Sequence, residues 1–97
     1  MKERIDDRHP VEILGSYRIG RGTQRNVTML DISETGAKFH DHRTILASDS
    51  KITLRVDTLG PFDAVVRWVE NDAVGVQFSQ RIYGPVFEHI RSTLSNR

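Results

Sequence analysis

The sequence predicts a mainly β protein, a six-stranded antiparallel β-barrel followed by one C-terminal α-helix. Two observations support this prediction. Short segments of alternating apolar and polar residues recur across residues 11–79, and after Gly84 the apolar spacing changes to every fourth residue. Short antiparallel strands at regular spacing favour a closed barrel, because closure removes exposed sheet edges. The 97 residues provide for one modest core, so we expect a single domain over residues 1–97.

Three strands are predicted in the first part of the chain. Apolar residues alternate across 11–19 around Gly15, which predicts a half-buried strand with a bulge or bend. The apolar residues of 26–33 predict a second strand, and those of 36–40 predict a third. We expect the second and third strands to form a hairpin whose tip is residues 31–36.

Three further strands are predicted after a polar stretch. Residues 52–56 show the clearest alternation in the chain, and the glycine and proline of residues 58–61 predict a turn. Strands are then predicted over 64–69 and 74–78. Trp68 shares its predicted face with two apolar residues of the same strand, so we expect its indole in the core and not as a platform for a ligand.

The end of the chain predicts an amphipathic helix over residues 84–95. Val86, Ile90 and Leu94 recur every four residues, and Pro85 suits a first helical turn. We expect the apolar stripe of this helix to cover an open end or flank of a barrel formed by residues 11–79.

Composition argues against several classes of protein. No apolar run approaches the roughly 18 residues of a membrane-spanning helix, so no membrane insertion is expected. No apolar segment follows the charged N-terminus, so we expect a cytoplasmic protein without a secretory signal. There is no cysteine, and His9, His40, His42 and His89 lack a zinc-type spacing, so neither a metal site nor a cofactor is expected.

The charge of the chain is nearly balanced, with a formal net charge of +1. This is too small for a general nucleic-acid binder, and no predicted strand interleaves basic and aromatic residues, so no DNA or RNA partner is expected. Arginine nevertheless outnumbers lysine by eleven to three. The planar guanidinium suits two-point contact with phosphate and with the O6/N7 edge of guanine.

Two short motifs stand at defined places relative to the predicted strands. Residues 4–8 read RIDDR just before the first strand, and residues 31–36 read DISETG at the tip of the predicted hairpin. In this order and placement they resemble the RxxxR and [D/N]xSxxG motifs of the PilZ domain family. Residues 66–68, residues 74–78 and the closing helix are also similar to that family, so the resemblance covers almost the whole chain.

The resemblance implies a PilZ-like split barrel that acts as a bacterial receptor or adaptor for the second messenger cyclic di-GMP. It implies no enzymatic activity, a conformational change on ligand binding, and signalling to an effector protein that the sequence does not identify. It also implies that residues 1–10 are flexible and fold over the barrel when ligand binds. The implied ligand-binding residues are Arg4, Arg8, Asp31, Ser33 and Gly36.

The chemistry of these residues fits the ligand. The guanidinium groups of Arg4 and Arg8 can contact phosphates or guanine, and Asp31 can accept hydrogen bonds from guanine N1–H and N2–H₂. Ser33 supplies a small hydroxyl, and Gly36 permits close approach. In the family, a further basic residue before RxxxR accompanies binding of a ligand dimer; here that position is Glu3, so we expect one cyclic di-GMP per domain, with Asp6 and Asp7 lowering affinity.

Other interpretations stay open at this point. The chain could be a PilZ-fold interaction module that does not bind cyclic di-GMP, and in either case we expect a monomer or weak dimer. Asp31, Ser33 and Gly36 could serve only the turn, and Arg4 and Arg8 could be a solvated tail. A catalytic triad of Ser33 with a histidine and an aspartate has little support, because no nucleophile-elbow signature surrounds the serine. Arg18, Arg21, Arg25 and Arg67 could make auxiliary contacts with ligand, but we expect an exposed position without that role for each of them.

Overall fold

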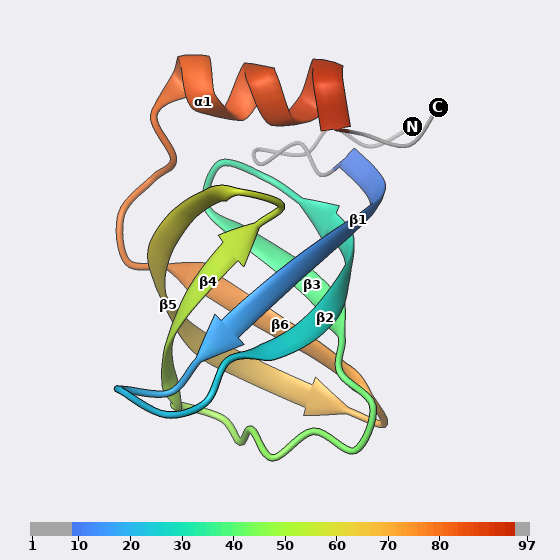
Figure 1. The fold of residues 1–97 in the computed structure, drawn as a ribbon, viewed down its shortest axis with the longest axis vertical. Helices are drawn as coiled ribbons and strands as arrows, with labels where there is room; N and C mark the ends of the chain where they lie inside the picture. Colours follow the sequence, from blue (N-terminus) through green and yellow to red (C-terminus); the bar gives the residue numbers. More distant parts are fainter. Residues whose placement is uncertain (1–8, 95–97) are drawn as a thin grey trace.

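The computed structural model describes residues 9–94, with side chains described for residues 13–92, and it contains a closed six-stranded antiparallel barrel (Figure 1). The predicted fold class is confirmed. The strands are β1 (His9–Arg18), β2 (Arg25–Ile32), β3 (Gly36–His40), β4 (Lys51–Val56), β5 (Leu59–Glu70) and β6 (Ala73–Phe78). The helix α1 (Gly84–His89) continues into a π-helical turn, η1 (Ile90–Leu94).

The strands close in the order β1-β2-β3-β6-β5-β4, and each neighbouring pair is antiparallel. In Figure 1, β1 crosses the front of the barrel, and β3 and β6 lie behind it. In β2, β3 and β4, alternate side chains point inward, as the sequence pattern predicts. The fully buried residues at the centre of the core are Met29, Ile32, Phe39, Leu54, Val56, Val66, Val74 and Ile90.

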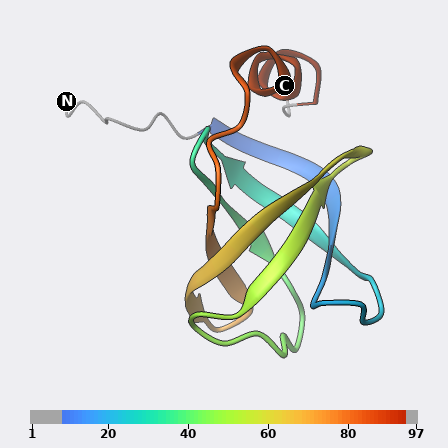
Figure 2. The ribbon, with the colours of Figure 1, turned by 90° about the vertical axis from the view of Figure 1, so that its left-hand side faces the viewer.

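The two ends of the barrel are closed by different means. The helix lies across one end, where Phe87 and Ile90 are buried against the strands (Figures 1 and 2). None of the helices in the described part of the chain has the length and apolar character needed to cross a membrane. The connection between β3 and β4 passes over the other end. Its apolar contribution to the core is Leu46, and its polar contribution is Asp41, which is 1% exposed.

Asp41 is the centre of a buried polar cluster. Its Oδ2 accepts a hydrogen bond of 2.7 Å from the Tyr17 hydroxyl, and its Oδ1 accepts bonds of 3.2 and 2.8 Å from Nε and Nη2 of Arg25. Burial alone would raise the pKa of Asp41, but the hydrogen bonds from Thr44, Tyr17 and Arg25 outweigh it and lower that pKa. Arg25 was predicted to be exposed; it is half-buried, because it forms an ion pair with this carboxylate.

The predicted turn over residues 58–61 is wrong. The turn is formed by Asp57 and Thr58, and β5 begins at Leu59, five residues before the predicted strand. The pairing of β4 with β5 shifts between Leu54 and Val56, which leaves Gly60 and Pro61 in an irregular part of the ladder. A proline is tolerated there, because the ladder does not require its missing N–H.

The predicted core position of Trp68 is also wrong. Val66 pairs with Val76 and Trp68 pairs with Gly75, so one extra residue stands between them on β5. Such a β-bulge reverses the alternation of side chains beyond it. Val66 is therefore fully buried, whereas Trp68 is turned outward and is 40% exposed.

Candidate functional site

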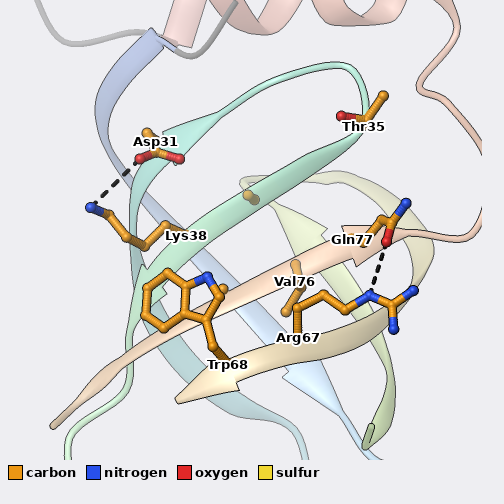
Figure 3. Close-up of a pocket in the computed structure, with 9 residues that line it drawn as sticks. Asp31, Thr35, Lys38, Arg67, Trp68, Val76 and Gln77 are labelled. Atoms are coloured by element: carbon orange, nitrogen blue, oxygen red, sulfur yellow. Dashed lines mark hydrogen bonds and ion pairs between the residues drawn. The ribbon is translucent and has the colours of Figure 1, made fainter. Parts of the chain in front are cut away.

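A cavity of about 440 Å³ opens on the outer face of the barrel where β3 and β6 pair (Figure 3). Its walls come from β2, β3, β5, β6 and the β2–β3 hairpin. The residues that line it are Asp31, Thr35, Ala37, Lys38, Arg67, Trp68, Gly75, Val76 and Gln77. One of these, Asp31, is a predicted ligand-binding residue, so the structure places a cavity at one end of the DISETG motif.

Trp68 forms an aromatic wall of this cavity because its partner across the sheet is a glycine. A Cβ built on Gly75 would overlap Cε2 and Nε1 of the indole and would lie 2.6 Å from Cζ2. The indole therefore packs directly against the backbone of β6, in space that any other residue would fill. The rest of the ring stays accessible, which leaves an aromatic surface open for stacking.

The polar groups of the cavity have mixed charge. Lys38 Nζ lies 3.7 Å from Asp31 Oδ2, and Arg67 Nε donates a hydrogen bond of 2.9 Å to Gln77 Oε1 (Figure 3). The Asp31 side chain is 19% exposed and the Lys38 side chain 40%. The cavity thus offers a carboxylate acceptor, two cationic groups and an aromatic face. This combination suits an anionic ligand that also carries a planar ring with N–H donors.

Ser33 has a structural role in the hairpin. It is fully buried, and its Oγ accepts hydrogen bonds from the backbone N–H of Thr35, at 3.2 Å, and of Gly36, at 3.1 Å. Its own N–H donates to the Gly36 carbonyl at 2.8 Å. The turn interpretation therefore describes what Ser33 does in this structure. Its contact with ligand stays a prediction, and so does that of Gly36, which is buried and pairs with the cavity residue Gln77.

The described part of the chain begins next to this hairpin. His9 pairs with Ile32, and Pro10 pairs with Asp31. Arg4 and Arg8, the remaining predicted ligand-binding residues, lie outside the described residues, so their contacts stay a prediction. The structure does show that the strand following the RIDDR motif runs along the residue that opens the DISETG motif.

The hairpin is also bonded to the segment that leads into α1. The Phe78 N–H donates to the Thr35 carbonyl at 2.7 Å, and the Ile82 N–H donates to the Glu34 carbonyl at 2.8 Å. Nε and Nη2 of Arg81 lie 3.0 and 2.9 Å from Glu34 Oε1. A displacement of the hairpin would therefore strain hydrogen bonds to the connection between β6 and the helix.

Lys38, Arg67, Trp68 and Gln77 were not predicted as site residues. They come from three strands that are brought together by the pairing of β3 with β6 and of β6 with β5. One signal in the sequence could have pointed to them. Gly75 stands inside a mostly apolar strand, which indicates the close approach of another group, and Trp68 is the chain's single tryptophan.

Among the described side chains, no group of three or more His, Asp or Glu residues is placed to hold a metal ion. Comparison with protein families gives a match to the PilZ domain over residues 2–94. No curated protein matches the chain.

Proposed function

The chain belongs to the PilZ domain family, whose model matches residues 2–94, and on that premise we propose that it is a receptor for cyclic di-GMP that signals to a partner protein. PilZ domains are generally binding and adaptor modules for this nucleotide and are not catalytic. The observation that best supports the proposal is the cavity beside the DISETG hairpin, which combines Asp31 with the exposed indole of Trp68.

The cavity groups match the chemistry of the nucleotide. Asp31 accepts hydrogen bonds from N1–H and N2–H₂ of one guanine, and the indole of Trp68 stacks on a base. Lys38 and Arg67 attract the phosphates. A volume of about 440 Å³ is within the range of small-molecule sites, roughly 300–1,000 Å³. We propose a stoichiometry of one cyclic di-GMP per chain, in keeping with Glu3 in place of a further basic residue.

The two arginines of the RIDDR motif complete the proposed site. Arg8 is joined to His9, which pairs with Ile32 of the hairpin, so its Cα is only about 3.8 Å from a residue that is paired with the motif. Arg4 is at most about 14 Å further along the chain. The length of chain before His9 is therefore short enough for both arginines to reach a nucleotide in the cavity.

The bonds between the hairpin and the residues before α1 support the proposed conformational signal. A ligand that contacts the hairpin favours those conformations of the protein to which it binds more tightly. Because Glu34 is bonded to both Arg81 and Ile82, such a shift reaches the start of the helix. We propose that the partner protein detects a change in the position of the helix and of the segment that connects it to β6.

Isothermal titration calorimetry with cyclic di-GMP tests the proposal. We expect saturable binding of one ligand per chain, and we expect Arg8→Ala to lower the affinity at least about tenfold, or about 1.4 kcal/mol. Arg21→Ala is the matched control, because Arg21 is an exposed arginine of the β1–β2 turn outside the cavity. Raising the salt concentration should weaken binding, because ions screen guanidinium–phosphate contacts.

Each result has a separate meaning. If the wild-type protein does not bind the nucleotide at high micromolar concentration, the receptor function is wrong and the ligand-independent interaction module becomes the better hypothesis. If Arg8→Ala binds as tightly as Arg21→Ala, the arginine motif has no part in the site. Two ligands per chain would contradict the proposed stoichiometry.

A further inference from the structure

A smaller cavity, of about 120 Å³, lies on the outer face where β1 pairs with β4. It is lined by Ser16, Arg18, Gln24, Thr53, Arg55 and Pro61. In the closed barrel, β2 separates this strand pair from β3 on one side, and β5 separates it from β6 on the other. The small cavity is therefore on the opposite side of the barrel from the cavity that contains Asp31; the strands on which it lies, β1 and β4, are at the front in Figure 1.

Ser16 is an unusual residue for the outer face of a barrel. Its neighbour Tyr17 points into the core, so Ser16 points outward, and yet it is only 7% exposed. Among residues 13–92, whose side chains are described, the Ser16 hydroxyl has no hydrogen-bond partner. Every side-chain oxygen or nitrogen of these residues that is fully enclosed does have one. The Ser16 hydroxyl must therefore keep some accessible surface, and it gains that surface by lining this cavity.

Two guanidinium groups flank the hydroxyl. Ser16 pairs with Arg55 and Arg18 pairs with Thr53, so the two arginines are diagonal neighbours on one face, at a typical separation of roughly 7–8 Å. Both are exposed, and within the described residues neither forms an ion pair. Arg55 Nη1 donates a hydrogen bond of 3.3 Å to the Gly60 carbonyl.

No carboxylate balances these charges inside the cavity. Asp63 pairs with Thr53 from the β5 side, but it lines the neighbouring cavities and not this one. Like charges placed close together on one sheet face are unfavourable. An anion between Arg18 and Arg55 would remove that repulsion, and it would also give the Ser16 hydroxyl an acceptor.

We propose that this cavity, the β1–β4 anion site, binds a phosphate group. A tetrahedral phosphate presents only acceptor oxygens when ionised, and the cavity surrounds it with two guanidinium forks and two hydroxyls as donors. The cavity is less than a third the size of the one that contains Asp31, which suits a group as small as one phosphate. The phosphate is either free or the exposed head group of an anionic lipid.

Nuclear magnetic resonance of the arginine Nε–Hε groups in the full chain tests the proposal directly. Inorganic phosphate is titrated at constant ionic strength, and we expect saturable shifts at Arg18 and Arg55 that are larger than those of Arg21. Ser16→Ala and Arg55→Gln should each weaken phosphate binding by about tenfold. Arg21→Gln is the matched control, since it removes the same charge from an exposed arginine outside the cavity.

A second arm distinguishes the two sources of phosphate. Co-sedimentation is measured with phosphatidylcholine vesicles that contain or lack phosphatidylglycerol. Binding of inorganic phosphate that Arg55→Gln weakens supports a free phosphate ligand, and vesicle binding that needs phosphatidylglycerol and Arg55 supports the lipid head group. The proposal is overturned if neither probe binds, or if Arg21→Gln weakens binding as much as Arg55→Gln does. Cyclic di-GMP is used in neither arm, so failure of the receptor function leaves this result unaffected.

Discussion

Replacement of Gly75 by alanine should reveal how the Trp68 wall of the cavity is built. The added methyl group would overlap Cε2 and Nε1 of the indole, so the ring must leave its place against β6. Trp68 is 40% exposed, so its covered surface is on the order of 100–150 Å², worth about 2–4 kcal/mol at roughly 25 cal/mol per Å². Because β6 covers only one side of the ring, we expect a loss of about 1–2 kcal/mol.

The same substitution has an opposite effect on the strand itself. Alanine is more favourable than glycine in a strand interior by about 0.5–1 kcal/mol, and the φ angle of Gly75 is not in the left-handed region. In the wild-type background, Gly75→Ala should therefore lower the free energy of unfolding by about 0–1.5 kcal/mol net. In a Trp68→Ala background the overlap is gone, so the same change should raise the free energy of unfolding by about 0.5–1 kcal/mol.

Urea denaturation followed by circular dichroism measures all four proteins of this cycle. The decisive result is a difference of about 1–2 kcal/mol between the effects of Gly75→Ala in the two backgrounds, because the strand preference of alanine is the same in both and cancels. A Gly75→Ala substitution that destabilises both backgrounds equally would refute the reasoning, and it would mean that Gly75 is required for something other than the indole. Calorimetry adds a functional measurement, since the displaced ring should also weaken binding of cyclic di-GMP.

Three further predictions concern the cluster around Asp41 and the hairpin. Asp41→Asn should lower the free energy of unfolding in urea by about 2 kcal/mol, less than for a fully buried ion pair because the Arg25 side chain is 36% exposed. The pKa of Asp41 is lower in the folded protein, so the stability that its charge provides is present above its unfolded pKa of about 4 and is lost as pH falls. In Asp41→Asn, the free energy of unfolding should therefore fall less steeply at acid pH. An unchanged dependence on pH would contradict this. Burial raises the pKa of Tyr17 to about 12, so the stability that its neutral form provides is present below an unfolded pKa of about 10 and is lost as pH rises from there towards 12. Urea denaturation measured as a function of pH should show that Tyr17→Phe lacks this loss of stability at alkaline pH. The same loss in both proteins would assign it to other groups. Ser33→Ala removes the acceptor of the Thr35 and Gly36 N–H groups and should lower the free energy of unfolding by about 1–2 kcal/mol even without ligand; no change in stability would contradict the structural role described for its hydroxyl.

The sequence predicted those parts of the fold in which side-chain alternation is uninterrupted. Residues 36–40 and 74–78 correspond to β3 and β6 within one residue, because the apolar residues that alternate along each strand are the ones buried in the core. The errors at Pro61 and Trp68 have a common cause. Both lie at register shifts in β5, where pairing with a neighbouring strand determines which way a side chain points. Local sequence does not reveal that pairing.

The candidate site was predicted only in part for the same reason. Asp31 could be identified because its whole motif is contiguous in the chain, and the structure does place it at a cavity. Arg67, Trp68 and Gln77 reach that cavity through contacts between strands, so their positions depend on barrel order and on one bulge. Ser16 was not predicted at all, because its burial between two arginines depends on the register of β1 with β4, which local sequence does not reveal.

The position of Trp68 has a practical consequence for optical measurements. Because it is the chain's single tryptophan, all indole fluorescence of the protein originates at the wall of the Asp31 cavity. The emission of unlabelled protein thus reports the polarity and stacking of that one surface, free of signal from any other indole. Selective excitation of the indole also avoids Tyr17 in the core and Tyr83 before the helix, so changes in that light describe the cavity and not the rest of the barrel.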